Sequence, residues 1–334
     1  MVRVLVTGGL GFIGSHLVRR LVSSDWCTSL INVDNMGFGS NVNNLKDVEG
    51  CRKYSFVYGD IRDPELVSRL VKDVDVVVNV AAETHVDRSI SNPKPFLETN
   101  VLGTFNLLEA CRHNDVRLFM QVSTDEVYGE AEGGRSFKEG DAFRPSSPYS
   151  ATKAAADCLV MAYNRTYGLN TIITRSTNNF GPYQHPEKFI PKAIIRAALG
   201  LKVPVYGSGR QVRDWIYVED HVEAIESALL KSRGGKVYNI SAGNELNNLE
   251  VVKQILRIMD KPMDLIEHVE DRPGHDARYS LDSSLIRSEL GWAPRHSFLE
   301  ALRKTVRWYM QNEWWWKPLA DERTLHPTPW KIRW

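Results

Sequence analysis

Tyr149 and Lys153 are four residues apart in the stretch YSATK, so a helix would place both side chains on one face. The sequence predicts such a helix from Ser147 or Pro148 to about Tyr167. A tyrosine with its ordinary pKa of about 10 is a poor base near neutral pH, and a neighbouring ammonium lowers that pKa. The spacing therefore predicts that Lys153 makes Tyr149 a usable base. Since such pairs also arise by chance, the prediction depends on the rest of the chain.

A hydroxyl and two carboxyls follow one another at Thr124, Asp125 and Glu126, just after the apolar run 118–122. We expect that run to be a buried strand with the three side chains at its carboxyl end. Two neighbouring carboxyls separate their pKa values, because ionising one disfavours ionising the other. The pair therefore offers an acid and a base beside the Thr124 hydroxyl. The alternative is a charged loop exposed to water.

Residues 2–16, VRVLVTGGLGFIGSH, predict a strand, a glycine-rich turn and then a helix. In this arrangement a dinucleotide pyrophosphate sits on the helix N-terminus. A second predicted strand ends at Asp34, twenty residues beyond Gly14. A carboxylate there accepts a hydrogen bond from the ribose 2′-OH and repels a 2′-phosphate, which favours NAD over NADP. The turn residues expected at the cofactor are Gly8, Gly11, Phe12, Ile13 and Gly14.

Other strand ends are expected at the same crevice. Asp60 follows a third predicted strand, where its carboxylate either binds the adenine amino group or closes a turn. Ala81 and Ala82 follow the nearly continuous apolar run 74–80, and their small side chains leave room for a cofactor. We expect His85 to be a loop histidine that hydrogen-bonds its neighbours.

The order of predicted elements gives the fold class. Strands and helices alternate through the first half, which predicts an α/β fold with a doubly wound parallel (Rossmann) sheet. The second half is less regular and predicts a smaller α/β lobe that binds substrate. We expect a dinucleotide-binding domain at 1–177 and a substrate lobe at 178–334, with 213–240 packing back against the first domain.

Composition limits the possible partners. Lys and Arg (42) nearly balance Asp and Glu (41), so no overall charge recruits nucleic acid or an acidic membrane surface. No apolar run is long enough to span a bilayer, and we expect a cytoplasmic protein without a metal site. The tryptophans at 314–316 are expected to be buried against the second lobe, although an exposed cluster could stack nucleic-acid bases. Reduced core thiols are expected at Cys27, Cys51, Cys111 and Cys158.

Several motifs together resemble a known superfamily. The turn TGGLGFIGSH, Asp34, the Thr124 segment and YSATK are similar to the extended short-chain dehydrogenase/reductases. Within that superfamily STDEVYG, NNFGPYQHPEKFIP, VYGSGRQVRDWIYVEDH and DRPGHDARY resemble the dTDP-glucose 4,6-dehydratases. The resemblance covers essentially the whole chain. It also implies a homodimer.

The resemblance implies a redox-neutral lyase that uses NAD. C4 of dTDP-glucose is oxidised, water is lost across C5 and C6, and the hydride returns to C6 to give dTDP-4-keto-6-deoxyglucose. In this scheme Tyr149 takes the O4 proton while Thr124 holds that oxygen. Glu126 is the base at C5, and Asp125, kept protonated, is the acid at C6.

The implied contacts extend beyond these residues. The implied contacts to the cofactor include Ile61 and Asn179, and also Tyr149 and Lys153. Those to the nucleotide sugar are Thr84, Thr124, Asn178, Lys188, Phe189, Tyr206, Arg213, Asn248, Arg272 and His275.

Three alternatives remain open at this point. A UDP-sugar 4-epimerase needs a hydride acceptor and one base but no carboxylate pair, so Asp125 and Glu126 argue against it. A UDP-glucose 4,6-dehydratase differs only in the nucleotide base. A non-catalytic NAD sensor would need neither the carboxylate pair nor Tyr149 with Lys153.

Overall fold

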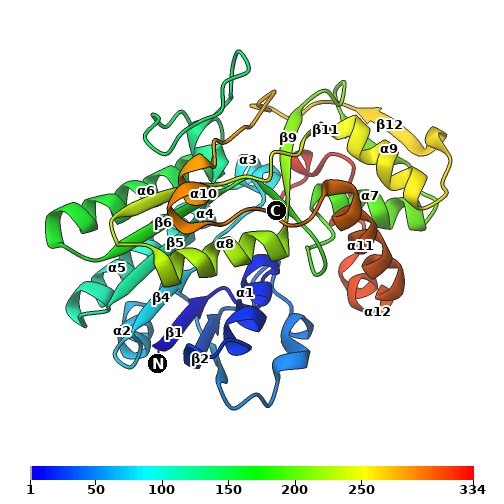
Figure 1. Cartoon of the computed structure of the whole chain (residues 1–334). Helices are drawn as coiled ribbons and strands as arrows, with labels where there is room; N and C mark the ends of the chain where they lie inside the picture. Colours follow the sequence, from blue (N-terminus) through cyan, green and yellow to red (C-terminus); the bar gives the residue numbers. More distant parts are fainter. Residues whose placement is uncertain (1) are drawn as a thin grey trace.

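The computed structural model describes residues 2–334. A seven-stranded parallel sheet has the strand order β10-β6-β5-β4-β1-β2-β3 (Figure 1). The strands are β1 (Val2–Thr7), β2 (Cys27–Asp34), β3 (Tyr54–Tyr58), β4 (Val76–Asn79), β5 (Leu118–Thr124), β6 (Thr171–Ser176) and β10 (Lys236–Ile240). The predicted doubly wound α/β fold is confirmed, and the apolar run predicted as a central strand is β4, in the middle of the sheet.

Helices cover both faces of this sheet, because successive side chains of a buried strand point to opposite sides. On β1, Val4 and Val6 belong to the core that includes α1 and α8, whereas Leu5 belongs to the core of α2, α5 and α6. These helices are α1 (Phe12–Val22), α2 (Pro64–Val71), α5 (Thr104–His113), α6 (Pro148–Tyr167) and α8 (Val218–Lys231). A shorter helix, α10 (Ser284–Leu290), lies against α8 and β10.

A smaller lobe is built mainly from the second half of the chain, as predicted. Its three-stranded sheet has the order β11-β9-β7, and a separate pair joins β12 to β8. The strands are β7 (Asn178–Phe180), β8 (Val203–Tyr206), β9 (Val212–Tyr217), β11 (Glu245–Asn247) and β12 (Ile266–Val269). The helices are α7 (Phe189–Ala198), α9 (Asn248–Ile258), α11 (Phe298–Gln311) and α12 (Glu313–Trp316).

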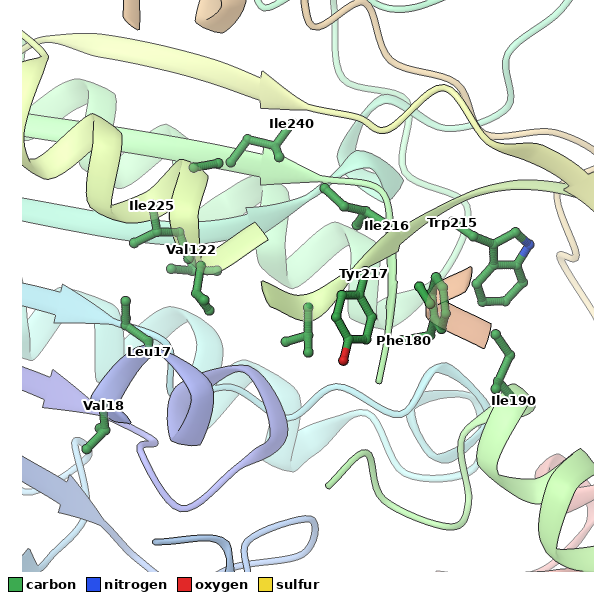
Figure 2. Close-up of a cluster of buried hydrophobic side chains, with 14 of the residues drawn as sticks. Leu17, Val18, Val122, Phe180, Ile190, Trp215, Ile216, Tyr217, Ile225 and Ile240 are labelled. Atoms are coloured by element: carbon green, nitrogen blue, oxygen red, sulfur yellow. The ribbon is translucent and has the colours of Figure 1, made fainter. Parts of the chain in front are cut away.

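The two parts share one hydrophobic core. Figure 2 shows buried side chains that run from Leu17 on α1 and Ile225 on α8 to Phe180 and Trp215 in the smaller lobe. All four are nearly inaccessible to solvent. This core passes without a break from the sheet to the lobe, so buried side chains of the two parts pack in one cluster.

Short helical segments connect the larger elements. Two short helices and a π-helical turn precede α5, namely α3 (Val86–Ser91), α4 (Lys94–Phe96) and η2 (Leu97–Gly103). Short 3₁₀ segments are η1 (Val42–Val48), η3 (Asp125–Tyr128), η4 (Met263–Leu265), η5 (Lys317–Leu319) and η6 (Pro329–Lys331). Within residues 2–334, no helix combines the length and the apolar character needed to cross a bilayer.

The predictions for cysteine were only partly right. All four cysteines are free, and Cys27 and Cys111 are buried. Cys158 is exposed, because Asp157 faces the protein interior and the next residue on α6 is turned about 100° away from it. Cys51 is only partly buried in the loop before β3.

The tryptophans at 314–316 divide in the same way. Trp315 and Trp316 are buried, as expected, whereas Trp314 is exposed. The Trp315 indole N–H donates to Asn44 Oδ1 at 2.8 Å, so it also contacts η1 beside the first sheet.

Candidate active site

One cleft lies at the carboxyl ends of the parallel strands and extends into the smaller lobe, which is the usual ligand position in such sheets. Its lining includes the predicted cofactor residues Gly8, Gly11, Phe12, Ile13, Gly14, Asp34, Asp60, Ile61, Ala81, Ala82, Tyr149 and Asn179. It also includes the predicted catalytic and substrate residues Thr84, Thr124, Asp125, Glu126, Asn178, Lys188, Phe189, Tyr206, Arg213, Asn248, Arg272 and His275. Of the predicted site residues, Lys153 alone is not part of this lining.

The glycine turn leaves bare backbone between β1 and α1. Gly8 has φ +71°, and a Cβ there would lie 2.7 Å from the Cα of Ala81. A Cβ at Gly14 would overlap the carbonyl oxygen of Gly8 and lie 2.8 Å from the Cα of Gly9. The first turn of α1 has no side-chain cap and no acidic residue. Its N–H groups are therefore available to an anion such as a phosphate.

Asp34 shapes the loop that follows β2. Its carboxylate accepts from the Leu10 N–H at 3.0 Å, the Met36 N–H at 2.8 Å and the Ser40 hydroxyl at 2.8 Å. Burial raises the pKa of Asp34, and these three donors oppose that rise. The carboxylate therefore orders loop 35–41 along the cleft, and its contact with a ribose stays a prediction.

Asp60 closes a turn, which was the alternative to a role in adenine binding. The Arg62 N–H donates to its Oδ1 at 2.8 Å. Its carboxylate accepts from Arg62 Nη2 at 2.7 Å and from Asn35 Nδ2 at 2.8 Å. It still lines the cleft, so its role toward adenine stays a prediction.

Thr124, Asp125 and Glu126 lie where β5 passes into η3. The Thr124 hydroxyl caps η3 by accepting from the Glu126 N–H at 3.2 Å, and it donates to Asp125 Oδ1 at 3.1 Å. Burial and then the charge of Glu126 hold the pKa of Asp125 well above its ordinary value. Asp125 Oδ2 is buried without a partner among the described residues. This environment favours a protonated Asp125.

Glu126 has a different environment from its neighbour. Burial raises its pKa, but nearby cations act in the opposite direction, namely Arg272, Arg213 and Lys188. The pKa of both carboxyls is raised, and that of Asp125 is held well above its ordinary value. Their roles as acid and base stay a prediction, whereas the charged-loop alternative is wrong because Asp125 is buried.

Tyr149 stands at the start of α6, which begins where it was predicted. Ser147 caps the helix in a capping box with Ser150, and Pro148 occupies a first-turn position. Burial raises the pKa of Tyr149, and the charge of Glu126 adds to that rise.

Lys153 lies one helical turn after Tyr149 on α6 and contacts β5. Its ammonium donates to the Val122 carbonyl at 2.7 Å, and burial lowers its pKa to about 8. For Tyr149, burial and the charge of Glu126 raise the pKa, whereas the Thr124 hydroxyl lowers it. That Lys153 makes Tyr149 a usable base stays a prediction.

Cations gather on the smaller-lobe side of the cleft. Arg213 is buried and donates to the Asp276 carbonyl at 2.9 Å, while its guanidinium lies 4.1 Å from the centre of the Tyr279 ring. The Lys188 ammonium donates to the Thr84 carbonyl at 2.7 Å. The net charge of the whole chain is close to zero, so these positive groups are a local feature of the cleft. They suit an anionic ligand.

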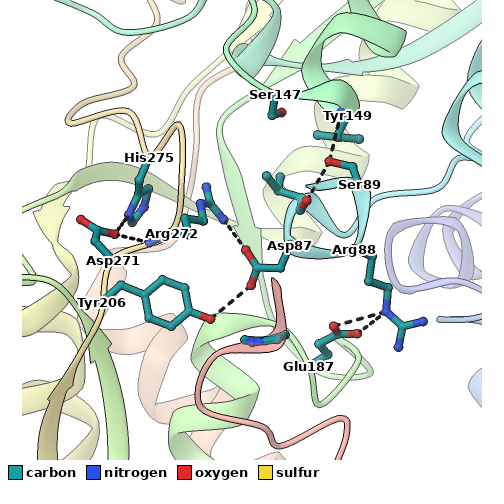
Figure 3. A network of polar contacts seen from close by, with 12 residues as sticks. Asp87, Arg88, Ser89, Ser147, Tyr149, Glu187, Tyr206, Asp271, Arg272 and His275 are labelled. Atoms are coloured by element: carbon teal, nitrogen blue, oxygen red, sulfur yellow. Dashed lines mark hydrogen bonds and ion pairs between the residues drawn. The ribbon is translucent and has the colours of Figure 1, made fainter. Parts of the chain in front are cut away.

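Asp87, on α3, joins two predicted substrate residues (Figure 3). Its carboxylate accepts from Arg272 Nη1 at 3.1 Å and from the Tyr206 hydroxyl at 3.2 Å. Close by, His275 Nδ1 lies 2.6 Å from Asp271 Oδ1. Asp87 also lines the cleft.

The sequence reasoning missed Asp87 and two other polar residues around the site. Ser89 accepts from the Tyr149 N–H at 3.3 Å. Asn100, in the π-helical turn, accepts from the Glu83 N–H at 2.9 Å and donates to Thr152 Oγ1 at 3.0 Å. None of the three directly follows a predicted strand. Asn100 lies in a π-helical turn, and a search for a sequence pattern of period 3.6 does not detect such a turn.

His85, His185 and Glu187 are close enough together to share a metal ion. However, Glu187 already accepts from Arg88 Nε at 2.9 and 3.3 Å. Burial and then the charge of Lys188 hold the pKa of His85 well below its ordinary value. This cationic surrounding disfavours a divalent metal. His85 precedes α3 in a loop, as expected, but its buried Nε2 has no hydrogen-bond partner among the described residues, so the prediction that the ring hydrogen-bonds its neighbours is wrong.

The family follows from this fold and site. A family model described as GDP-mannose 4,6 dehydratase matches residues 5–305. The chain belongs to this family of nucleotide-sugar enzymes.

Individual relatives narrow the comparison. A dTDP-glucose 4,6-dehydratase from Mycobacterium tuberculosis is 48% identical over 322 residues, which are 96% of each chain. The crystal structure of DesIV, a dTDP-glucose 4,6-dehydratase from Streptomyces venezuelae with NAD bound, has a TM-score of 0.93 and 45% identity, covering 95% of this chain and 100% of DesIV. A UDP-glucose 4-epimerase from Thermus thermophilus in complex with NAD has a TM-score of 0.86 and 32% identity, covering 93% and 99%.

Proposed function

We propose that this protein is an NAD-dependent dTDP-glucose 4,6-dehydratase. The observation that carries the proposal is the pair Asp125 and Glu126, which are adjacent but differ in electrostatic environment beside Thr124 and Tyr149. The named dehydratase relatives support it. An epimerase shares the fold, but its reaction does not need the acid and base pair. A non-catalytic sensor would not need it either.

The chain's own residues fit NAD. The turn at Gly8 and Gly14 has room only for backbone, so a pyrophosphate can approach the uncapped N-terminus of α1. Asp34, at the end of β2, is placed for an adenosine ribose. When bound, NAD supplies the oxidant for C4 and the reductant for C6. The relatives with bound NAD support this assignment.

In the mechanism that we propose, Tyr149 and Thr124 act on O4. Thr124 holds the O4 oxygen by a hydrogen bond, and Tyr149 accepts the O4 proton as the alcohol becomes a ketone. The raised pKa of Tyr149 must fall when ligands bind. A cation placed against the phenol lowers its pKa, and Lys153 lies one helical turn away to contribute once its carbonyl contact is weakened.

Elimination across C5 and C6 uses the two carboxyls. The 4-ketone acidifies the C5 proton, and Glu126 accepts it. Asp125, which burial keeps protonated, donates its proton to the C6 hydroxyl so that water leaves. Both protons then have a donor or acceptor of suitable acidity.

The cationic side of the cleft is assigned to the nucleotide diphosphate. Arg213 and Arg272 supply guanidinium groups for the pyrophosphate, and His275 lies beside Arg272. Other proposed contacts to the nucleotide sugar are Thr84, Asn178, Lys188, Phe189, Tyr206 and Asn248.

Isotope transfer tests the proposal. An equimolar mixture of dTDP-[4-²H]glucose and dTDP-[¹³C₆]glucose is incubated with the protein and NAD, and products are analysed by mass. The deuterium should move to C6 of the same ¹²C sugar, with loss of water and no net accumulation of NADH. Deuterium that stays at C4 in a product of unchanged sugar mass would identify an epimerase. A parallel reaction with UDP-glucose separates the two nucleotide bases.

We infer a division of labour between the parts. Residues 1–177 with β10 and α8 hold the cofactor, and most of 178–334 holds the nucleotide sugar. β10 pairs with β6 in the first sheet and α8 packs against α1, which supports the assignment of 218–240 to that side. Residues 213–217 belong to β9, which pairs with β7 and β11 in the smaller lobe, so the expectation that all of 213–240 packs against the first domain is wrong for these residues. The four free cysteines suit a reducing compartment, and we propose the cytoplasm.

We further propose a homodimer. Large apolar side chains are exposed on η2, α5 and α6, which pack beside one another, namely Leu97, Leu102, Phe105, Met161 and Tyr167. Such a patch suits a helix-to-helix contact with a second copy. Light scattering should give a dimer for the natural chain and a monomer for Leu102→Lys. A monomer in both would overturn this proposal.

A further inference from the structure

The Arg88 guanidinium is sandwiched between two aromatic rings. Its central carbon lies 3.0 Å from the centre of the Phe38 ring and 3.6 Å from that of Trp334. The two ring centres are 6.2 Å apart, so the guanidinium fills the space between them. The Arg88 side chain is 13% exposed, and Glu187 accepts its Nε–H at 2.9 Å (Figure 3). A planar, delocalised cation is suited to both kinds of contact.

The partners of Arg88 come from separate parts of the chain. Phe38 belongs to loop 35–41, which Asp34 orders and which lines the cofactor side of the cleft. Glu187 precedes α7 in the smaller lobe. Trp334 belongs to the segment 326–334, which lies against α3 through η6. One side chain on α3 therefore connects the cofactor loop, the smaller lobe and the segment 326–334.

The segment 326–334 is held at other points along the cleft. Lys192 Nζ donates to the His326 carbonyl at 3.1 Å. The Trp330 ring lies edge-on to the ring of Tyr206, with centres 4.7 Å apart. Arg323 donates to the Arg333 carbonyl at 2.8 Å. The segment thus reaches from Tyr206 to Phe38, two residues that line the cleft, although none of residues 326–334 is part of that lining.

The connection through Arg88 between loop 35–41, the smaller lobe and the segment 326–334 is relevant to a redox-neutral reaction. The cofactor must stay bound while it is reduced, because its loss at that stage would leave the enzyme with an oxidised sugar and no hydride to return. Loop 35–41 contributes to the lining of the cleft, and a loop in such a position can control access to a bound ligand. Loop 35–41 is the loop along the predicted adenosine side.

We propose that Arg88 is a positioning residue that, clamped between Phe38 and Trp334, fastens loop 35–41 and the segment 326–334 across the cleft and slows the release of NAD. This inference rests on the proposed function, since it concerns the same cofactor. Arg88 does not contact the reacting atoms in this scheme. Its effect is on the residence time of the cofactor.

The test compares single tryptophan variants by their rate of NAD release. Protein loaded with radiolabelled NAD is mixed with excess unlabelled NAD, and the label retained on a filter is followed over time. Trp334→Ala should release NAD about 3- to 30-fold faster, because one face of the sandwich is removed. Trp334→Phe should restore slow release. Trp314→Ala is the matched control, since Trp314 is exposed and lies outside the clamp.

Arg88→Lys and the steady-state kinetics add a second readout. Lysine keeps the charge near Glu187 but not the planar stack, so Arg88→Lys should release NAD faster than the natural protein. In Trp334→Ala and Arg88→Lys the apparent KM for NAD should rise by a larger factor than the factor by which kcat falls. A general loss of folded protein would lower kcat without raising this KM. Phe38→Ala provides the same test if Trp334→Ala does not fold, because Phe38 is 40% exposed.

The outcomes separate the two proposals. Unchanged NAD release in Trp334→Ala and Arg88→Lys, with dehydratase activity intact, would overturn the clamp and leave the proposed function standing. Equal acceleration in Trp314→Ala would also overturn it. If the natural protein binds no NAD, the proposed function fails and the clamp fails with it.

Discussion

Replacing Glu126 by Gln removes the proposed C5 base and leaves the size of the side chain almost unchanged. The structure predicts opposite effects on the two halves of the reaction. Elimination should lose its base. Oxidation at C4 should become easier, because the charge of Glu126 is one of the causes that raise the pKa of Tyr149.

The expected size follows from the role of a general base. Such a base contributes about 10²- to 10⁴-fold, which corresponds to about 2.7–5.4 kcal/mol of barrier. We therefore expect the rate of dehydration to fall by about that factor. The cations Arg213 and Arg272 lose a negative neighbour in the variant, so binding of the nucleotide diphosphate should be retained.

The pH dependence gives the sign of each effect. Burial raises the pKa of Glu126, so the carboxylate that acts as base is lost as pH falls through that raised value. Dehydration by the natural protein should therefore decline on the acid side at a higher pH than an ordinary glutamate would give. In Glu126→Gln this acid limb should disappear. Oxidation at C4 should extend to lower pH, since the phenol becomes more acidic.

Single-turnover spectroscopy measures both halves at once. In Glu126→Gln the absorbance of reduced nicotinamide should form and persist, with little 4-keto-6-deoxy product in the quenched samples. Glu132→Gln, an exposed glutamate six residues further along, is the matched control and should behave as the natural protein. Product formation at the natural rate in Glu126→Gln would refute the assignment of the base.

Three further changes test other parts of the structure. Arg213→Ala should raise the KM for dTDP-glucose about 10- to 150-fold through loss of a charge-assisted contact. Arg210→Ala, at an exposed position, should leave this KM unchanged. An unchanged affinity of Arg213→Ala for dTDP would show that Arg213 is not part of the substrate site. Gly14→Ala should weaken NAD binding at least about tenfold in a calorimetric titration, because its Cβ would overlap Gly8, whereas Gly140→Ala meets no neighbour and should bind normally. Asp157→Asn should lower the free energy of unfolding by about 3–5 kcal/mol in urea titrations, because the buried charge of Arg175 would lose its charged partner at 2.8 Å. The surface change Glu300→Gln should leave the midpoint of urea unfolding unchanged.

The fold and the outline of the site were predictable because their signals are local. The glycine turn, the buried strand β4 and the capped helix α6 each have a sequence pattern tied to one geometry. Once the strands are parallel, their carboxyl ends meet at one edge. Residues that follow different strands, such as Asp34 and Thr124, therefore line the same cleft.

The remaining features depend on contacts between distant segments. Lys153 has the predicted spacing from Tyr149, but its ammonium bonds the carbonyl of Val122, which no spacing reveals. Cys158 adjoins the buried Asp157 and is nevertheless exposed, because one step along a helix turns the side chain by about 100°. Trp334 meets Arg88, although the two residues are far apart in the sequence. Such pairings follow from the tertiary structure, where burial and competing partners decide the outcome.

The position of β10 at the edge of the first sheet determines the order in which the chain can fold during synthesis. β6 is complete at Ser176, but the strand that covers its outer edge ends at Ile240, after much of the smaller lobe has been made. At ordinary rates of translation the unpaired edge of β6 is exposed for about 3–13 s. An uncovered edge of this kind is a template for pairing with other chains. A fragment that ends near residue 177 would keep that edge permanently open, so the cofactor-binding half should aggregate when it is expressed alone.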